Sequence, residues 1–185
     1  RAELTTAGRR FRTRSDTEVI LHAYAVHGDA CVERLAGMFA FAIWDRQEQT
    51  LHLARDPLGI KPLYLRHTGE RLLFASEINA LIASGTFSPA IDPIAVEEYL
   101  GWLAVPAPRT IYQGITSLRP GESARFRLGQ LELTRAWSQS PPRLTGEVYR
   151  TRSEFIRHLR IKLEDSVRAH VAADVPVGAF LSGGL

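Results

Sequence analysis

Several residue types and patterns are scarce in this chain, and each scarcity excludes a class of protein. Cys31 is the only cysteine among 185 residues, which excludes an internal disulfide framework and suits a reducing compartment, the cytoplasm. No apolar run reaches the roughly 18 residues of a membrane-spanning helix, so we expect no membrane partner. The histidines are dispersed without zinc-site spacing, so we expect no metal ligands in the chain.

Lysine is almost absent, and charge of one sign nowhere accumulates. The 23 basic residues include two lysines, Lys61 and Lys162, and are scattered among 20 acidic residues for a net charge of +3. Because no segment forms a basic stripe, we expect no nucleic-acid partner. With 45% hydrophobic residues, the chain has the composition of a globular protein with one complete core and the start of another.

The pattern up to about residue 137 predicts a layered α+β domain. Apolar runs of strand length are joined by short turns, as in hairpins, and helical periodicity lies before and after them. We expect helices at 16–26, 30–35, 77–84 and 93–102, and strands at 38–44, 50–55, 63–67 and 71–75, with further short strands between 110 and 137. Residues 138–150, which contain Pro141 and Pro142, have the composition of a linker.

The end of the chain predicts the opening of a second domain, an α/β nucleotide-binding domain over residues 151–185. An apolar stripe with a capping box at Thr151 and Glu154 indicates a helix of about twenty residues. A short apolar run, 175–181, then has the character of a buried strand, and Ser182-Gly183-Gly184 follows it. Two glycines and a hydroxyl suit a phosphate-binding loop, although such a triplet is more often an ordinary turn.

Five segments, taken together, resemble the glutamine-hydrolysing asparagine synthetase family. They are SDTEVI (15–20), GMFAFA (37–42), RDPLGIKPLY (55–64), FASEI (74–78) and DVPVGAFLSGGL (174–185). The resemblance covers essentially the whole chain, and the order and spacing of the segments make it specific. Because the chain begins at Arg1 and stops inside the glycine turn, we expect it to be an internal piece of a longer protein.

The resemblance implies an incomplete four-layer αββα N-terminal-nucleophile glutaminase domain, followed by the first helix and strand of an ATP-pyrophosphatase domain. It implies ammonia release from glutamine in the first domain. In the second, ATP with Mg²⁺ would activate an aspartate-like acceptor, which ammonia converts to asparagine. The resemblance leaves a homodimer open, and it leaves open relatives with another acceptor, such as β-lactam synthetases, and a degenerate scaffold without catalysis.

The resemblance also assigns site residues. Asp16 would bind the α-amino group of glutamine, although an aspartate here is equally suited to capping a helix. Arg55, Asp56 and Gly59 would shape a loop near the site, and we interpret Arg55 and Asp56 as a buried ion pair. Phe180, Ser182, Gly183 and Gly184 would contact ATP, unless they form only a frayed tail.

The resemblance places no catalytic residue inside the chain. In the family, the nucleophile is a cysteine at the mature N-terminus, with its own α-amino group as base, so we expect it before Arg1. Cys31 lies among apolar residues of a predicted helix, and we interpret it as a packing residue.

Overall fold

A computed structural model describes residues 1–135, 149, 151–171, 173, 175–181 and 183. The chain divides into two compact units, Arg1–Gln139 and Ser140–Leu185. Among the described residues, no helix has the length and apolar character needed to cross a bilayer.

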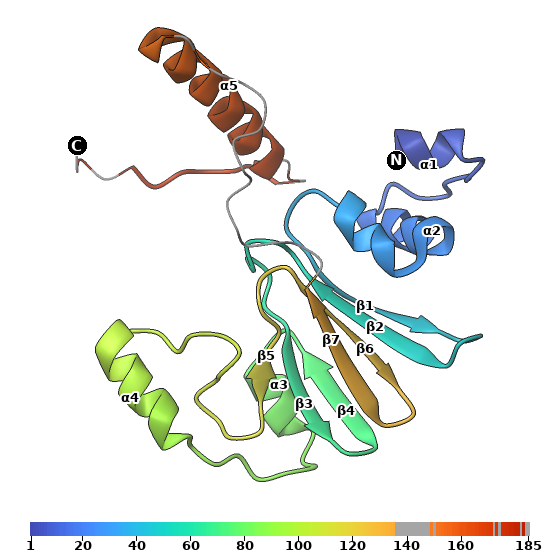
Figure 1. The fold of residues 1–185 in the computed structure, drawn as a ribbon, viewed down its shortest axis with the longest axis vertical. Coiled ribbons are helices and arrows are strands. Elements are labelled where there is room, and N and C mark those ends of the chain that lie inside the picture. Colours follow the sequence, from blue (N-terminus) through green and yellow to red (C-terminus); the bar gives the residue numbers. More distant parts are fainter. Residues whose placement is uncertain (136–148, 150, 172, 174, 182, 184–185) are drawn as a thin grey trace. The chain divides into compact units, whose positions relative to one another are not determined.

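Two antiparallel sheets form the centre of the first unit (Figure 1). A four-stranded sheet has the order β1-β2-β6-β7, and a three-stranded sheet has the order β4-β3-β5. The strands are β1 (Ala40–Asp45), β2 (Thr50–Arg55), β3 (Tyr64–Thr68), β4 (Arg71–Ala75), β5 (Thr116–Ser117), β6 (Glu122–Arg127) and β7 (Gln130–Arg135). The predicted hairpins β1–β2 and β3–β4 are both present.

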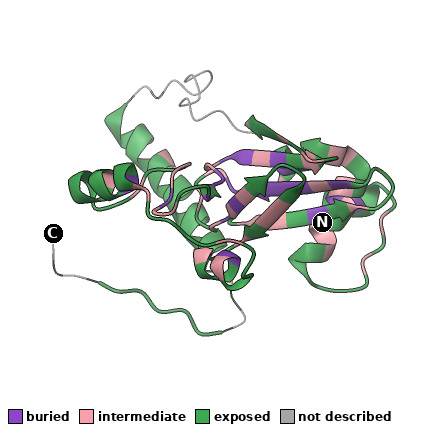
Figure 2. Ribbon diagram, turned by 90° about the horizontal axis from the view of Figure 1, so that it is seen from below, coloured by how far each residue is buried: buried purple, intermediate pink, exposed green. Residues whose placement is uncertain are grey.

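Side-chain alternation along β2 explains why the four-stranded sheet is buried on both faces. Leu53 packs with Leu65 of β3 and Ala124 of β6 in a core between the two sheets. Ala54, the next residue, points to the opposite face and packs with Ala23 and Cys31 in a second core. Figure 2 shows buried positions concentrated along the strands.

Helices cover the outer faces of both sheets. The helices α1 (Ala2–Thr6), α2 (Asp16–His27) and the 3-10 helix η1 (Gly28–Arg34) supply the second core on the four-stranded sheet. The helix α3 (Ile78–Ala83) packs against β4 of the other sheet, and α4 (Pro93–Trp102) follows it in the chain. The resulting order of layers, helix–sheet–sheet–helix, confirms the predicted αββα architecture (Figure 1).

The second unit contains one helix, α5 (Arg152–His170), among its described residues. The helix start is confirmed at Thr151, the N-cap, whose hydroxyl oxygen accepts a hydrogen bond from the N–H of Glu154 at 3.1 Å. The strand predicted at 175–181 is not formed, and Val175, Phe180 and Leu181 are exposed. A strand needs a hydrogen-bonded neighbour, and both described sheets are made of strands from the first unit.

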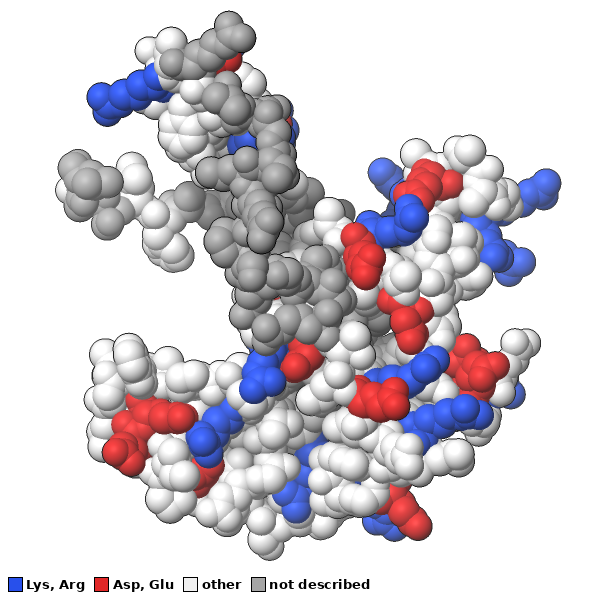
Figure 3. Space-filling view, viewed as in Figure 1, with Lys and Arg blue, Asp and Glu red and all other residues white. Residues whose placement is uncertain are grey.

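Charged side chains of both signs are mixed on the surface of the first unit. Figure 3 shows lysines and arginines interspersed with aspartates and glutamates over the visible face. Several of these charges pair locally, such as Arg34 with Glu3 and Arg109 with Asp92.

Candidate functional site

Four of the five segments singled out in the sequence border one cavity of ≈ 380 Å³. The cavity lies where the N-terminus of α2 meets β1 and the loop after β2. Its lining residues are Asp16, Thr17, Ile20 and Leu21 from α2, Met38 to Ile43 in and before β1, and Lys61, Pro62 and Ser76. Segments separated by up to sixty residues thus meet around Asp16, which makes this cavity the candidate site.

Ser15, and not Asp16, is the N-cap of α2. The Ser15 hydroxyl oxygen accepts a hydrogen bond from the N–H of Thr17 at 3.1 Å. Asp16 Oδ1 accepts a bond from the same N–H at 2.8 Å and one from the Ser15 hydroxyl at 3.4 Å. Among the contacts of the described residues, Asp16 Oδ2 accepts none. The side chain is exposed, so one carboxylate oxygen is left for a ligand.

Glu18 holds the loop that leads into α2. Its carboxylate accepts hydrogen bonds from the N–H of Arg12 at 2.8 Å, and from the N–H and hydroxyl of Thr13 at 2.7 and 2.6 Å. The Thr13 hydroxyl, together with the two backbone donors, lowers the pKa of Glu18 to about 2. The Ser-Asp-Thr-Glu segment therefore combines the N-cap Ser15, a free carboxylate oxygen on Asp16, and a clamp, which is the set of hydrogen bonds that Glu18 accepts from the preceding loop.

Asp56 shapes the loop on the other side of the cavity. Although it is 1% exposed, Oδ1 accepts hydrogen bonds from the N–H groups of Leu58 and Ile60, and Oδ2 accepts one from the N–H of Lys61. Burial opposes ionisation of the group, but these donors outweigh it and lower the pKa of Asp56. The carboxylate thereby fixes the backbone of Lys61, which borders the cavity.

The predicted ion pair between Arg55 and Asp56 is wrong. Arg55 donates instead to the carbonyl oxygens of Gly59, Lys61 and Leu118, at 2.6, 2.8 and 2.6 Å, and to the Ser117 hydroxyl at 3.0 Å. Neighbouring residues at a strand end point in different directions, so the two side chains bond to different groups. Asp56 bonds to N–H groups of the loop, whereas Arg55 bonds to carbonyl groups of the loop and also to Ser117 and Leu118.

Gly59 allows the loop to approach Arg55 closely. Its φ of +66° lies in the left-handed region, and a Cβ at this position would lie 2.7 Å from Pro120 Cγ and 3.1 Å from Arg55 Cζ. Both the backbone conformation and the space therefore require glycine.

The described residues that were predicted to contact ATP are open to solvent. Phe180 is fully exposed, and no atom lies within 4 Å of a Cβ placed on Gly183. Ser182 and Gly184 lie outside the described residues. Within the described ranges, no group of three or more histidine, cysteine or acidic side chains is placed to hold a metal ion.

Cys31 is a packing residue, as its apolar neighbours in the sequence predict. It is 1% exposed in the core between η1 and the four-stranded sheet. Burial, with a contribution from Asp29, raises the pKa of its thiol to about 11. The thiolate that a nucleophile needs is therefore disfavoured.

Comparisons with known proteins match both parts of the chain to protein families. The profile of the glutamine amidotransferase domain family matches residues 1–137, and that of the asparagine synthase family matches residues 158–185. Asparagine synthetase [glutamine-hydrolyzing] 3 of Bacillus subtilis is 37% identical over the whole chain, which spans 30% of that relative's length. The corresponding putative synthetase of Mycobacterium tuberculosis is 40% identical over the whole chain, which spans 29% of its length.

A solved structure supports the fold. Glutamine phosphoribosylpyrophosphate amidotransferase from B. subtilis aligns with a TM-score of 0.52 over 74% of this chain and 26% of its own, at 23% sequence identity. With the domain profile covering the first unit up to residue 137, the chain belongs to the glutamine amidotransferase domain family.

Proposed function

We propose that this chain belongs to an enzyme of ATP-dependent, glutamine-hydrolysing amide synthesis, with Asp16 in the glutamine site. The reaction converts aspartate, glutamine, ATP and water to asparagine, glutamate, AMP and pyrophosphate. The proposal places the protein in the cytoplasm, with glutamine and an aspartate-like acceptor as its small-molecule partners, and it allows a homodimer.

The observation that carries the proposal is the free oxygen of Asp16 at the cavity. The α-ammonium of an amino acid carries hydrogen-bond donors and a positive charge, which an exposed carboxylate oxygen accepts and neutralises. Ser15 caps the helix, so Asp16 is not needed for that task. Glu18 and Asp56 fix the two backbone segments that lead to Asp16 and Lys61, which keeps the cavity preorganised.

We expect the nucleophile of glutamine hydrolysis to be the N-terminal cysteine that the family uses. Within this chain, the residues orient the substrate. Asp16 would hold the α-amino end, and the apolar side chains of 38–43 would exclude water from the glutamine side chain.

Residues 151–185 would belong to the synthetase domain. ATP with Mg²⁺, when bound there, would supply the adenylating chemistry. Because Phe180 is exposed and Gly183 has open space around it, no step of that chemistry is assigned to these residues. In this proposal the two sites are separate, which protects the activated acceptor from water. Ammonia would pass from one site to the other without being protonated.

An enzyme with the same two domains and another acceptor is the second candidate function, because one relative is named an amidase and not an asparagine synthetase. Amidase chry2 of Gibberella zeae is 32% identical over 95% of this chain, which spans 26% of that relative. A protein with the same two domains and another acceptor would fit the first unit equally well. An assay of AMP formation by the complete gene product distinguishes the two functions. AMP formation should depend on added aspartate if asparagine is the product.

Replacing Asp16 tests the glutamine site. Asp16→Asn keeps the shape and removes the charge, so the KM for glutamine should rise about 10- to 100-fold, the loss of one charge-assisted hydrogen bond. Amide synthesis from free ammonia by the same preparation should be retained, since ammonia bypasses this site. Asp165→Asn, at an exposed aspartate of α5, is the matched control. An unchanged KM in Asp16→Asn would refute the proposed site.

A further inference from the structure

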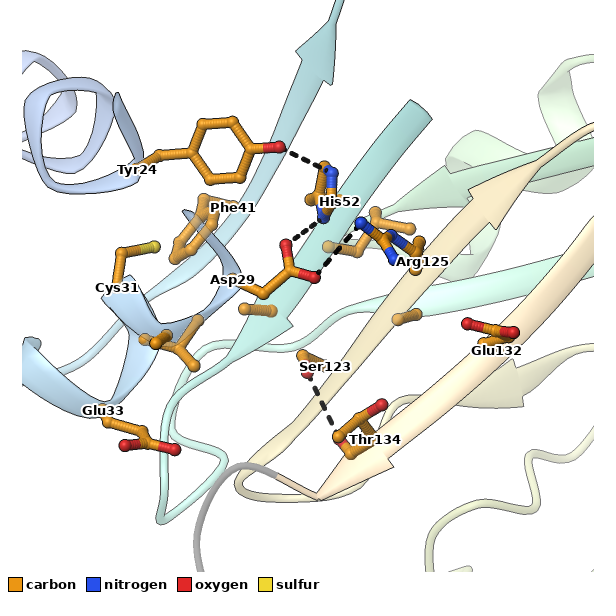
Figure 4. Close-up of a pocket in the computed structure, with 15 residues that line it drawn as sticks. Tyr24, Asp29, Cys31, Glu33, Phe41, His52, Ser123, Arg125, Glu132 and Thr134 are labelled. Atoms are coloured by element: carbon orange, nitrogen blue, oxygen red, sulfur yellow. Dashed lines mark hydrogen bonds and ion pairs between the residues drawn. The ribbon is translucent and has the colours of Figure 1, made fainter. Parts of the chain in front are cut away.

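A second cavity, of ≈ 270 Å³, lies on the outer face of the four-stranded sheet beside η1. His52 of β2 stands in it with 7% of its surface exposed (Figure 4). Its Nδ1 lies 2.7 Å from Asp29 Oδ1 of η1, and its Nε2 lies 2.7 Å from the hydroxyl of Tyr24 on α2. One strand residue thus joins the two consecutive helices that cover this sheet.

The same cluster is extended by two charged residues. The Tyr24 hydroxyl also lies 3.2 Å from Asp45 Oδ2 at the end of β1, and Arg125 Nη2 of β6 lies 3.6 Å from Asp29 Oδ2. Figure 4 shows Asp29 between His52 and Arg125. None of these residues borders the cavity that holds Asp16. The cluster therefore has no direct part in the glutamine site.

The link adds a polar attachment to a helix that packs on the sheet through few side chains. Ala23 is the buried residue of α2, and Val19 and Tyr24, which are partly buried, pack against the same core. Tyr24 and Asp16 are eight residues apart on one rigid helix, about 12 Å along its axis. A change in how the Tyr24 end rests on β2 therefore tilts or shifts Asp16, and displacements of about 1 Å are enough to weaken substrate binding.

We propose that His52 is a positioning residue for the glutamine site, acting through Tyr24 and α2 on Asp16. The inference rests on the function proposed above. It explains why a histidine is buried under these helices. Leucine at this position would fill the space but would leave the Tyr24 hydroxyl and the Asp29 carboxylate without their shared partner.

The proton positions follow from the partners of His52. With Asp29 ionised, Nδ1 carries the proton and donates it to Asp29, and the Tyr24 hydroxyl shares its single proton between the neutral Nε2 at 2.7 Å and Asp45 Oδ2 at 3.2 Å. Burial is the largest influence and lowers the pKa of His52; Arg125 acts in the same direction, while Asp29 and Asp45 oppose it. The titratable and charged groups that line this cavity or contact the cluster are Tyr24, Asp29, Cys31, Glu33, Asp45, Arg125 and Glu132. The buried site therefore disfavours the protonated ring. When the pH falls below about 6.5, the ordinary pKa of histidine, protonation favours conformations in which His52 is outside this site.

Three variants of the complete protein test the inference. His52→Leu removes both hydrogen bonds and Tyr24→Phe removes the link to α2, so each should raise the KM for glutamine about tenfold with kcat nearly unchanged. His52→Gln keeps a donor and an acceptor but does not titrate. It should retain the wild-type KM at neutral pH, and it should lack the rise in KM that we expect of the wild type on acidification.

His67→Gln is the matched control, because His67 of β3 also joins two segments, through the carbonyl oxygens of Gly69 and Gly129. It lies on the other sheet, so its KM should equal that of the wild type. If His52→Leu does not fold, Tyr24→Phe and the pH profile of His52→Gln still decide the question.

A double variant separates this inference from the proposed function. If His52 acts through Asp16, His52→Leu should raise the KM much less in the Asp16→Asn background than in the wild type. An unchanged KM in Asp16→Asn alone would overturn the proposed glutamine site. A normal effect of Asp16→Asn, with an unchanged or fully additive KM in His52→Leu, would overturn only the role of His52. A lower kcat or a lower melting temperature in His52→Leu, without a change in KM, would also overturn the role of His52.

Discussion

At the scale of single residues, the loop after β2 is built by side chains that replace secondary structure. Arg55 donates to the carbonyl oxygens of this loop, and Asp56 accepts from its N–H groups. Buried backbone polar groups need partners, and a loop without a strand neighbour obtains them from side chains. The tightness of this arrangement leaves no space for a Cβ at Gly59.

Gly59→Ala should destabilise the first unit by about 1–3 kcal/mol, the usual cost of left-handed backbone strain, with a further cost from the contact with Pro120. Urea denaturation followed by tryptophan fluorescence measures the change. Gly69→Ala is the control, because Gly69 has a φ of +56° and a Cβ added to it would have no atom within 4 Å. If both variants are destabilised equally, strain alone accounts for the effect and steric exclusion at Gly59 is refuted.

Residue roles were predictable where a motif fixes one function, and less so where partners come from distant segments. The position of Asp16 at the start of a helix followed from the sequence, but the capping role of Ser15 was decided by the local backbone. The Arg55–Asp56 pair was predicted wrongly because adjacency in sequence says little about direction at a strand end. Nothing in the sequence pointed to His52, whose partners Asp29 and Tyr24 lie 23 and 28 positions earlier in the chain.

At the scale of elements, helix α2 depends on the segment that precedes it. Glu18 accepts three hydrogen bonds from Arg12 and Thr13, and this clamp determines where the helix begins. A carboxylate with so many donors is stabilised only while it is ionised. The clamp should therefore depend on pH.

Glu18→Gln should destabilise the first unit at neutral pH, and the difference from the wild type should vanish in acid. The pKa of Glu18 is about 2 in the folded protein and 4.5 ordinarily, so its stabilisation is complete above about pH 4.5. It is lost as the pH falls toward 2, where the wild-type carboxyl is protonated as well. Urea midpoints measured across this range give the comparison. Glu97→Gln, at an exposed glutamate of α4, should show no such trend. A difference for Glu18→Gln that is constant with pH would contradict the clamp.

Elements with strong local signals formed where they were predicted. Helix α4 begins after Asp92, whose carboxylate accepts the N–H of Ile94 at 3.0 Å, and ends at Trp102 as expected. The helix expected at 30–35 is instead a 3-10 helix over Gly28–Arg34, because Gly28 with a φ of +57° ends α2 and the chain restarts in a tighter turn. The apolar run 175–181 has strand composition but no strand beside it among the described residues, and composition alone does not supply hydrogen-bond partners.

At the scale of the whole molecule, the two units differ in how their apolar residues are covered. The first unit buries two cores, one on each face of the four-stranded sheet. In α5 no residue is buried, and Phe155, Ile156 and Leu159 of its apolar stripe are all more than 40% exposed. The sequence predicted this stripe correctly, but a stripe indicates only that a helix needs a partner surface, and not what that surface is.

Hydrogen exchange should separate the two units. An isolated helix of this length is only marginally stable in water, because packing of the apolar face normally supplies most of its stability. Amides of α5 in the 185-residue chain should therefore exchange at least about 100-fold faster than those of β2, which is paired on both sides by β1 and β6. Mass spectrometry of peptic fragments covers both segments in one experiment, and β6 serves as the internal reference. Equal protection of α5 and β2 would show that the stripe is covered in solution and would contradict the expected rapid exchange of α5.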